Sequence, residues 1–383
     1  MMEQTIFRCP KVIIKGKDTL LKVGEEASKY GQRVMIVTGK SSTKKSGALD
    51  KVCHALIEKN LSYIVFDEVE SDPSVDTVMK GATLCKDEKI EVIVAIGGGS
   101  PLDAAKGIAI VATNGGNIRD YEKQSLSQSA LPIVAIPTTA GTGSEVTRFT
   151  VITDTETKVK MLIAADSIVP HTAILDPMLT LTMPKDVTAA TGMDALTHAI
   201  EAYISKVATP MSDIFALKAI ELIVANLIPA VCNPGNIEAR ANMLYGQMYA
   251  GLAFSNASVA LVHAMSRPLG AHFGVPHGVA NAILLPSVMN YNRCSCIGKM
   301  KDIAKAMGEV VDGLSTRDAS YSVLQVIDDL FAETGLKGRL SMYDIPEEKL
   351  GQLAEDAYNS GSRLNNPRLA TQEEILAIYQ SIY

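Results

Sequence analysis

The stretch VIVAIGGGSPLDAAKGIAIV, residues 92–111, indicates how the first half of this sequence folds. An apolar run at 92–96 leads directly into Gly97-Gly98-Gly99-Ser100-Pro101, and a helical pattern follows over 102–111. Three glycines after a strand let the backbone approach a ligand with no Cβ in the way. The start of the next helix offers unpaired N–H groups and a positive dipole end, which suit a phosphate. The stretch predicts a strand–loop–helix unit with a phosphate-binding loop, although a tight turn alone would also account for three glycines.

The same alternation of strand and helix continues on both sides of this stretch. Continuous apolar runs at 34–38, 63–66, 133–136 and 172–175 alternate with amphipathic segments at 18–29, 48–59 and 74–86. Buried strands separated by helices predict a parallel sheet covered on both faces. We therefore expect residues 1–184 to form a doubly wound α/β domain.

The second half has a different periodicity. Strand-like runs give way to long helical patterns, which we expect at 187–205, 212–232, 237–254, 259–272, 278–290, 320–334, 347–358 and 372–382. Proline and glycine mark the gaps, as in Asn233-Pro234-Gly235. Residues 185–383 are therefore predicted to form an all-helical domain.

Composition excludes several classes of partner. The chain has 383 residues, of which 47% are hydrophobic and 20% charged, and 36 basic against 42 acidic residues give a net charge of −6. Without a basic block, we expect no nucleic-acid partner. We also expect no membrane span, because no apolar run approaches the ~20 residues that a span needs. The amino terminus lacks the regions of a signal peptide, so a cytoplasmic location is predicted.

A second loop rich in small residues and hydroxyls follows the run at 133–136. It reads PTTAGTGSE, residues 137–145. The carboxyl ends of parallel strands share one edge of the sheet, and ligands bind at that edge. An ordinary loop that caps the next helix is the alternative.

Four residues in the helical half could bind a metal. Asp194 and His198 are four apart and so share a helix face. His263 lies on another predicted helix, and His277 opens the one after it. One carboxylate and three imidazoles suit Fe²⁺ or Zn²⁺ rather than Mg²⁺ or Ca²⁺. The spacing alone leaves ligation and coincidence equally open. We expect His54 and His171 to be core residues, and His272 to face solvent.

Four segments together resemble the iron-containing (group III) alcohol dehydrogenases. They are GGGSPLDAAKG (97–107), PTTAGTGSEVT (137–147), ATGMDALTHAIEAY (190–203) and HAMSRPLGAHFGVPHGVANAILLP (263–286). The likeness spans nearly the whole chain. It implies an amino-terminal dinucleotide-binding domain, a helical metal-binding domain with a dehydroquinate synthase-like architecture, and assembly into a homo-oligomer.

The resemblance also implies which residues form the site. The metal ligands would be Asp194, His198, His263 and His277. Phe149 and Val259 would line the substrate pocket. The cofactor contacts would be Gly39, Ser41, Asp72, Gly97, Gly98, Gly99, Ser100, Asp103, Thr138, Thr139, Thr142 and Lys160.

Two positions depart from the family pattern. Many relatives carry a second histidine where this chain has Arg267, and an arginine cannot act as a general base at neutral pH. Arg267 could instead hold an anionic group of the substrate, or it could pair with a nearby carboxylate. Many NAD-preferring relatives have an aspartate where this chain has Gly39, and Lys40 to Lys45 add hydroxyls and cations. The exchange makes NADP(H) admissible beside NAD(H).

The predicted function is a metal-dependent oxidoreductase that moves hydride between NAD(P)(H) and a small primary alcohol or aldehyde. Fe²⁺ is the expected metal, with Zn²⁺ possible. A glycerol dehydrogenase-like zinc polyol dehydrogenase is one alternative, and a catalytically silent nucleotide-binding scaffold is another.

Overall fold

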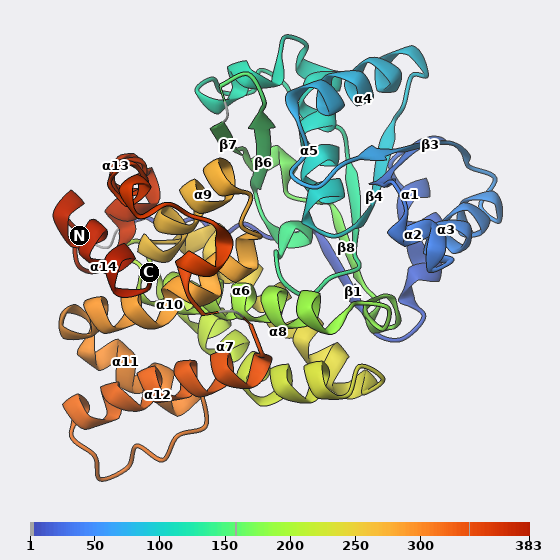
Figure 1. Ribbon diagram of the computed structural model, residues 1–383. Coiled ribbons are helices and arrows are strands. Elements are labelled where there is room, and N and C mark those ends of the chain that lie inside the picture. The colour runs from blue at the N-terminus through green and yellow to red at the C-terminus, as the bar shows by residue number, and fades with distance from the viewer. Residues whose placement is uncertain (1–3, 158, 337) are drawn as a thin grey trace. The chain divides into compact units, whose positions relative to one another are not determined.

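The chain folds into two compact units. The computed structural model describes residues 4–157, 159–336 and 338–383. One unit is Arg8–Thr182, and the other combines residues 4–7 with Met183–Tyr383. Figure 1 labels most helices and strands of both units.

The unit Arg8–Thr182 contains a six-stranded parallel sheet in the order β1-β8-β5-β4-β2-β3. A separate antiparallel pair, β6 and β7, follows β5 in the chain. The strands are β1 (Val12–Lys15), β2 (Arg33–Gly39), β3 (Ser62–Val69), β4 (Val92–Gly97), β5 (Ile133–Pro137), β6 (Phe149–Asp154), β7 (Val159–Ala164) and β8 (Thr172–Leu175).

Helices cover both faces of this sheet. Neighbouring residues of β2 show it: Val34 and Ile36 pack in a cluster with residues of α1 and α3, whereas Met35 and Val37 pack with residues of α4 and α5. Because successive side chains of a strand point to opposite faces, both faces are buried, as in doubly wound folds. The predicted parallel-sheet fold is confirmed. The helices of this unit are α1 (Val23–Ser28), α2 (Ser42–Lys45), α3 (Ala48–Ile57), α4 (Val75–Asp87) and α5 (Gly99–Asn114).

The order of the strands reverses between β2 and β4. From β2 the chain moves outward to β3, and from β4 it moves the other way to β5 and then β8. Ligands of open α/β sheets bind where the carboxyl ends of the two strands flank such a reversal. Those ends are Gly39 of β2 and Gly97 of β4, which follow the paired residues Thr38 and Ile96.

The second unit is helical, as predicted. Its α-helices are α6 (Lys185–Ile204), α7 (Pro210–Cys232), α8 (Ile237–Ala257), α9 (Leu261–Phe273), α10 (His277–Asn292), α11 (Ile297–Ala306), α12 (Thr316–Thr334), α13 (Leu350–Asn359) and α14 (Gln372–Ser381). Helices α6, α7 and α8 pack against one another, and α9 and α10 form a neighbouring pair.

Helix α7 corrects one expectation from the sequence. It is long and apolar enough to cross a membrane, with a mean hydropathy of 2.0 over its most apolar window, so the expected absence of such a run was wrong. Of that window, 39% is buried in the protein, on the side that packs against α6 and α8. Core helices of soluble proteins commonly pass the same test of length and composition, so α7 is weak evidence for a membrane span.

Candidate metal centre and nucleotide-binding loops

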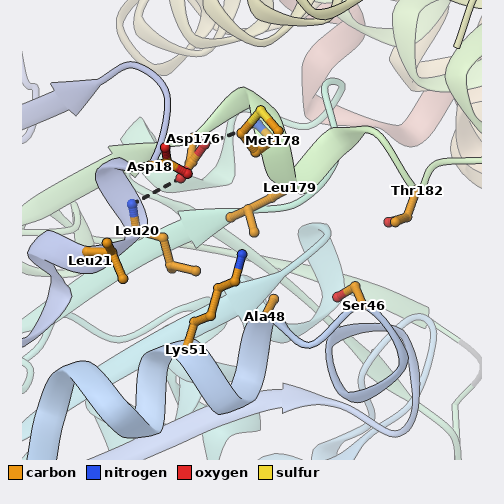
Figure 2. A pocket seen from close by; sticks show the side chains of 10 residues that line it. All are labelled: Asp18, Leu20, Leu21, Ser46, Ala48, Lys51, Asp176, Met178, Leu179 and Thr182. Atoms are coloured by element: carbon orange, nitrogen blue, oxygen red, sulfur yellow. Dashed lines mark hydrogen bonds between the residues drawn. The ribbon is translucent and has the colours of Figure 1, made fainter. Parts of the chain in front are cut away.

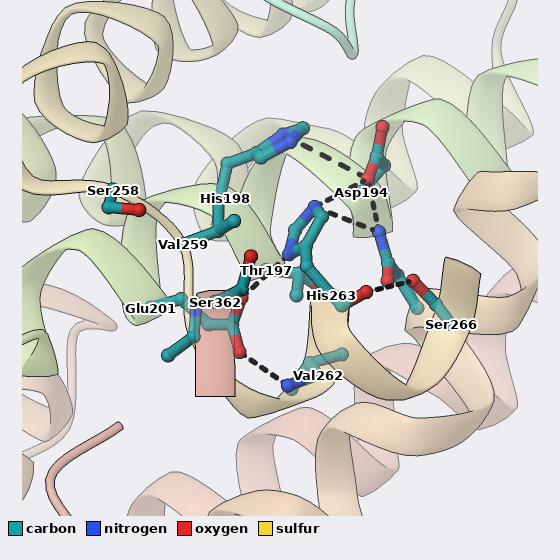
Figure 3. A network of polar contacts seen from close by, with 12 residues as sticks. Asp194, Thr197, His198, Glu201, Ser258, Val259, Val262, His263, Ser266 and Ser362 are labelled. Carbon is teal, nitrogen blue, oxygen red and sulfur yellow. Dashed lines mark hydrogen bonds and ion pairs between the residues drawn. The ribbon is translucent and has the colours of Figure 1, made fainter. Parts of the chain in front are cut away.

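Three helices bring one carboxylate and three imidazoles together. Asp194 and His198 lie one turn apart on α6, His263 lies on α9, and His277 is the first residue of α10. One ligand atom from each of these four residues lies within 4.8 Å of the other three. We call these four residues the four-donor group. The Asp194 Oδ1 atom is 3.8–3.9 Å from one ring nitrogen of each histidine. Figure 3 shows Asp194, His198 and His263 turned toward a common point.

The environment of the group favours a neutral imidazole at His263. Asp194, His198 and His263 are 3%, 6% and 3% exposed, whereas the side chain of His277 is 39% exposed. Burial lowers the pKa of His263 well below its usual value, and the charges of His198 and Arg267 lower that pKa further. An imidazole must be deprotonated to bind a metal, so this environment suits ligation.

The donors fit a divalent cation such as Fe²⁺ or Zn²⁺. Distances of 3.8–3.9 Å are too long for hydrogen bonds between the donors, yet one carboxylate and three imidazoles are a common ligand set for these metals. Asn281 Nδ2 donates to Asp194 Oδ1 at 2.6 Å, whereas Asn281 Oδ1 and His198 Nδ1 are buried with no hydrogen-bond partner among the described residues. Buried polar atoms without a partner are uncommon in protein interiors. Here one such atom belongs to the four-donor group and the other to Asn281, which contacts the group.

The remaining histidines take no part in the group. The side chain of His54 is 72% exposed and lies 3.5 Å from Glu58, so its predicted core position was wrong. It lies on the solvent side of α3, because the apolar positions of that helix fall on its other face. His171 is partly buried against Tyr30. His272, on the surface as expected, contacts Asp356 at 2.6 Å.

One further acidic residue contacts the group, and the sequence analysis missed it. Glu201 is buried on α6, and its carboxylate lies 2.6 Å from Nδ1 of His263. Burial raises the pKa of Glu201 to about 7, and hydrogen bonds from backbone N–H groups act against this rise. The signal was present in the sequence, since residues 194, 198 and 201 follow the i, i+4, i+7 spacing of one helix face.

The two loops predicted to bind phosphate meet at the ends of β4 and β5. Thr138 N–H donates to the carbonyl of Gly97 at 2.8 Å. A Cβ on Gly99 would lie 2.8 Å from the methyl group of Thr142, and one on Gly98 would lie 3.4 Å from that of Thr139. Gly97 has a φ of +151°, which side chains rarely adopt. The loops therefore approach each other most closely at Gly99, where a side chain would clash with Thr142.

Other predicted cofactor residues lie beside these loops. Ser100 Oγ accepts a hydrogen bond from the N–H of Asp72 at 3.2 Å. The carboxylate of Asp72 pairs with Lys160 Nζ on β7 at 2.9 Å. Gly39 is the last residue of β2, and a Cβ built on it would lie 3.8 Å from Pro101. Ser41 is exposed and directly precedes α2.

Asp103 has its carboxylate turned into the unit. One oxygen accepts from Ser144 Oγ at 2.7 Å and the other from the N–H of Val151 at 3.1 Å. Lys106, one turn later on α5, is fully buried and donates to Ser144 Oγ at 2.9 Å and to the carbonyl of Phe149 at 2.7 Å. Asp103 and Lys106 thus join the helix after the first loop to the second loop and to β6.

The predicted substrate residues lie on different units. Phe149 begins β6 of the sheet unit, whereas Val259 and Arg267 belong to the helical unit. Val259 is buried just before α9. Arg267 is partly buried on α9, and its Nη1 donates to Ser362 Oγ at 3.0 Å. Across the described ranges no carboxylate lies within 4.0 Å of its guanidinium, so the alternative of a direct ion pair has no support.

A cavity of about 170 Å³ in the sheet unit takes no part in this site. Figure 2 shows its lining, which includes Leu20, Lys51, Asp176 and Met178. None of the predicted cofactor residues lines it.

Comparison with known proteins identifies the family. Residues 10–177 match the family described as iron-containing alcohol dehydrogenase, and residues 188–383 match its C-terminal region. The chain belongs to the iron-containing alcohol dehydrogenase family. It is accordingly an NAD(P)-dependent alcohol dehydrogenase that transfers hydride between an alcohol and an aldehyde.

Relatives cover nearly the whole enzyme. A 1,3-propanediol dehydrogenase of Klebsiella pneumoniae is 43% identical over 380 residues, which are 98% of each chain. A crystal structure of 1,3-propanediol oxidoreductase has a TM-score of 0.97 at 42% identity and covers 100% of both chains. A sulfoacetaldehyde reductase from Bifidobacterium kashiwanohense, solved with NAD⁺, has a TM-score of 0.89 at 31% identity and covers 99% of both chains.

The family uses Fe²⁺ with either nicotinamide cofactor. An NAD-dependent methanol dehydrogenase of Bacillus methanolicus is 37% identical over 98% of this chain and 99% of its own. An NADPH-dependent butanol dehydrogenase of Clostridium saccharobutylicum is also 37% identical, over 98% of this chain and 97% of its own.

Proposed function

We propose that this enzyme interconverts a small primary alcohol and its aldehyde at a metal held by the four-donor group. The observation that carries the proposal is the convergence of Asp194 with three imidazoles from α6, α9 and α10 within 4.8 Å. A bound divalent cation supplies Lewis-acid stabilisation of the negative charge that develops on the substrate oxygen. The chain itself contributes the four ligand side chains and a largely buried setting, in which charge interactions are stronger than in water.

Substitution of His263 tests the proposal. We expect His263→Ala to lose most of the iron bound per subunit and nearly all turnover, because the variant removes a buried ligand and leaves its neighbours in place. His54→Ala removes an exposed histidine on α3 and serves as the control, with unchanged iron content and activity. Wild-type iron content and turnover in His263→Ala would remove His263 from the ligand set.

We also propose that residues 1–184 bind the dinucleotide and residues 185–383 hold the metal and the substrate. The contact between the two glycine-containing loops at the carboxyl ends of β4 and β5 supports the first assignment, because this edge of an open α/β sheet accepts phosphates. The four-donor group supports the second. We further propose that Phe149 and Val259 line the substrate pocket.

A finer proposal concerns the substrate class: Arg267 binds an anionic group on the aldehyde. Arg267 is partly buried, and its single described hydrogen bond to Ser362 leaves several donors for a carboxylate or sulfonate. Burial lowers the pKa of Arg267 and the charge of Glu201 opposes this change, yet an arginine keeps its proton at neutral pH. The related sulfoacetaldehyde reductase acts on an aldehyde of this kind.

Two substrates of similar length distinguish this proposal from a structural role. We expect Arg267→Ala to lower kcat/KM for succinic semialdehyde roughly 10- to 100-fold more than for butanal, because a charged hydrogen bond contributes roughly 1.5–3 kcal/mol. Arg267→Lys keeps the charge but loses the fork geometry, and we expect it to fall between. An equal loss for both aldehydes in Arg267→Ala would contradict anion binding.

We propose NADP(H) as the preferred cofactor, with NAD(H) accepted. Gly39 at the end of β2 has no carboxylate to repel a 2′-phosphate, and the exposed Lys40 follows it directly. Parallel assays with NADPH and NADH test the preference. We expect Gly39→Asp to raise the KM for NADPH, and an unchanged KM would contradict this assignment.

Assembly and location are also proposals. We propose a homo-oligomer, as the family likeness implies, with Ile6, Met211 and Ile214 of the helical unit, which are 69%, 49% and 69% exposed, as candidate contact residues. Light scattering on the purified enzyme tests this, and a monomeric mass would contradict it. The six cysteines are all free thiols, which supports the cytoplasmic assignment.

A further inference from the structure

Glu201 makes three contacts with the start of α9. Its Oε2 accepts from the N–H of Ala260 at 2.9 Å and lies 2.6 Å from Nδ1 of His263, while its Oε1 accepts from the N–H of Val262 at 2.5 Å. Figure 3 shows Glu201 of α6 beside Val262 and His263. One side chain thus occupies two N–H groups at the start of α9 and one ring nitrogen of a proposed ligand.

The segment that Glu201 holds is a sharp corner. Helices α8 and α9 meet at 103° across a break of three residues, Ser258, Val259 and Ala260. Ser258 has φ 62° and ψ 174°, a region nearly reserved for glycine, where other residues cost about 1–3 kcal/mol. Asn365 donates to Ser258 Oγ at 2.9 Å on one side of the corner. Such a corner keeps its shape only when neighbouring groups restrain it, and Glu201 is one of them.

The contact with Nδ1 also determines which ring nitrogen of His263 is available. A neutral imidazole that donates its Nδ1 hydrogen to Glu201 keeps an unprotonated Nε2. That Nε2 faces the four-donor group, 3.8 Å from Asp194 Oδ1 and 3.1 Å from Asn281 Nδ2. A carboxylate behind a ligating histidine commonly fixes its orientation and raises its basicity.

We propose that Glu201 is a positioning residue that raises the affinity of the site for its metal by holding His263 and the start of α9 in place. This inference rests on the proposed assignment of His263 as a ligand. Glu201 acts through the imidazole of His263. Its removal should therefore weaken metal binding by more than the accompanying loss of apoprotein stability explains.

Metal titrations test the inference with matched variants. We expect Glu201→Ala to raise the Kd for Fe²⁺, measured anaerobically against a competing chelator, roughly 10- to 100-fold, as for other carboxylates behind ligating histidines. Glu201→Gln keeps the shape and one acceptor but places an N–H₂ group against a backbone N–H or the ring, so its Kd should lie between. The Kd values for Zn²⁺ should increase in the same order, from wild type through Glu201→Gln to Glu201→Ala.

Asp176→Asn provides the control for loss of a buried carboxylate. In the sheet unit, Asp176 is buried and accepts from the N–H groups of Leu20 at 3.2 Å and Met178 at 3.1 Å, but contacts no proposed ligand (Figure 2). We expect this variant to lower Tm without a change in the Kd for Fe²⁺. A Glu201→Ala Kd within threefold of wild type, with a Tm loss like that of Asp176→Asn, would overturn the inference.

A double-mutant comparison distinguishes failure of the inference from failure of the ligand assignment. If Glu201 acts through His263, then adding Glu201→Ala to His263→Ala should weaken the remaining metal binding far less than Glu201→Ala weakens the wild type. Equal weakening in both backgrounds would overturn the positioning role while leaving His263 a ligand. Wild-type affinity in His263→Ala would overturn both.

Discussion

Gly99 shows how closely the two phosphate-binding loops approach each other. Its Cα lies so near Thr142 that a Cβ would be 2.8 Å from the threonine methyl, closer than real Cβ contacts come. The sequence predicted glycines for approach to a ligand, and in the structure this glycine also accommodates a neighbouring loop. The side chain that requires a glycine at position 99 lies more than 40 residues away in the chain.

We expect Gly99→Ala to raise the KM for NAD(P)H roughly tenfold, because overpacking of about 1–3 kcal/mol must push the loops apart. Thr142→Ser removes the methyl group in contact, so the double variant should regain most of the affinity. Gly351→Ala on α13, where a Cβ meets nothing within 4 Å, is the control and should bind cofactor normally. A wild-type KM in Gly99→Ala would show that the loops do not need this contact.

Lys106 provides a pH-dependent prediction. Burial lowers the pKa of Lys106 to about 8 from 10.5, so between these pH values the unfolded chain binds more protons than the folded one. Stability must then rise with pH across this window, by up to about 3 kcal/mol at roughly 1.4 kcal/mol per pKa unit. Below pH 8 the full cost of burying the ammonium is present.

Urea unfolding of wild type and Lys106→Met at pH 7 and pH 10 measures the effect. The free energy of unfolding of wild type minus that of Lys106→Met should be larger at pH 10 than at pH 7, because methionine does not titrate. Lys80→Met, an exposed lysine paired with Glu68, should give the same difference at both pH values. If the difference in the free energy of unfolding between wild type and Lys106→Met does not change with pH, the lowered pKa of Lys106 is contradicted.

At the scale of elements, most strands of the parallel sheet could be predicted from the sequence, whereas β1, β6 and β7 could not. Strand β8 lies at its expected residues, 172–175, and β4 within one residue of them, because both are buried on both faces. Strand β1 lies at the sheet edge, and its apolar run covers only residues 12–14. Strands β6 and β7 form a separate antiparallel hairpin; β6 mixes apolar with polar residues, and the apolar run of β7 covers only residues 161–164. Helix α11 is short and carries three lysines.

Arg240 links two elements of the helical unit, and its loss should be costly. It is 2% exposed on α8 and donates to Thr188 Oγ1 on α6 at 2.7 Å, to the carbonyl of Met183 at 3.3 Å and to that of Pro234 at 3.2 Å. We expect Arg240→Ala to lower the free energy of unfolding by roughly 3 kcal/mol, since it leaves a cavity and unpaired acceptors.

Denaturant melts would reveal this loss. Arg33→Ala, which removes an exposed ion pair with Glu91, is the control and should cost less than about 1 kcal/mol. Equal losses for the two variants would mean that Arg240 contributes no more than a surface residue.

At the scale of the whole molecule, the candidate metal site was only partly predictable from the residues. Asp194 and His198 form a local pattern on one helix, which spacing reveals. His263 and His277 join them only through the packing of α6, α9 and α10, and family likeness supplied that information at the sequence level. Glu201 belongs to the same face of α6, but nothing local shows that a corner 59 residues later in the chain would meet it.

The measurement that tests the account most directly is anomalous diffraction at the iron edge from crystals of the enzyme loaded anaerobically with Fe²⁺. We predict one strong peak per subunit, about 2 Å from a donor atom of each of Asp194, His198, His263 and His277. A peak elsewhere, or iron bound by fewer than three of these residues, would contradict the metal centre proposed for this dehydrogenase.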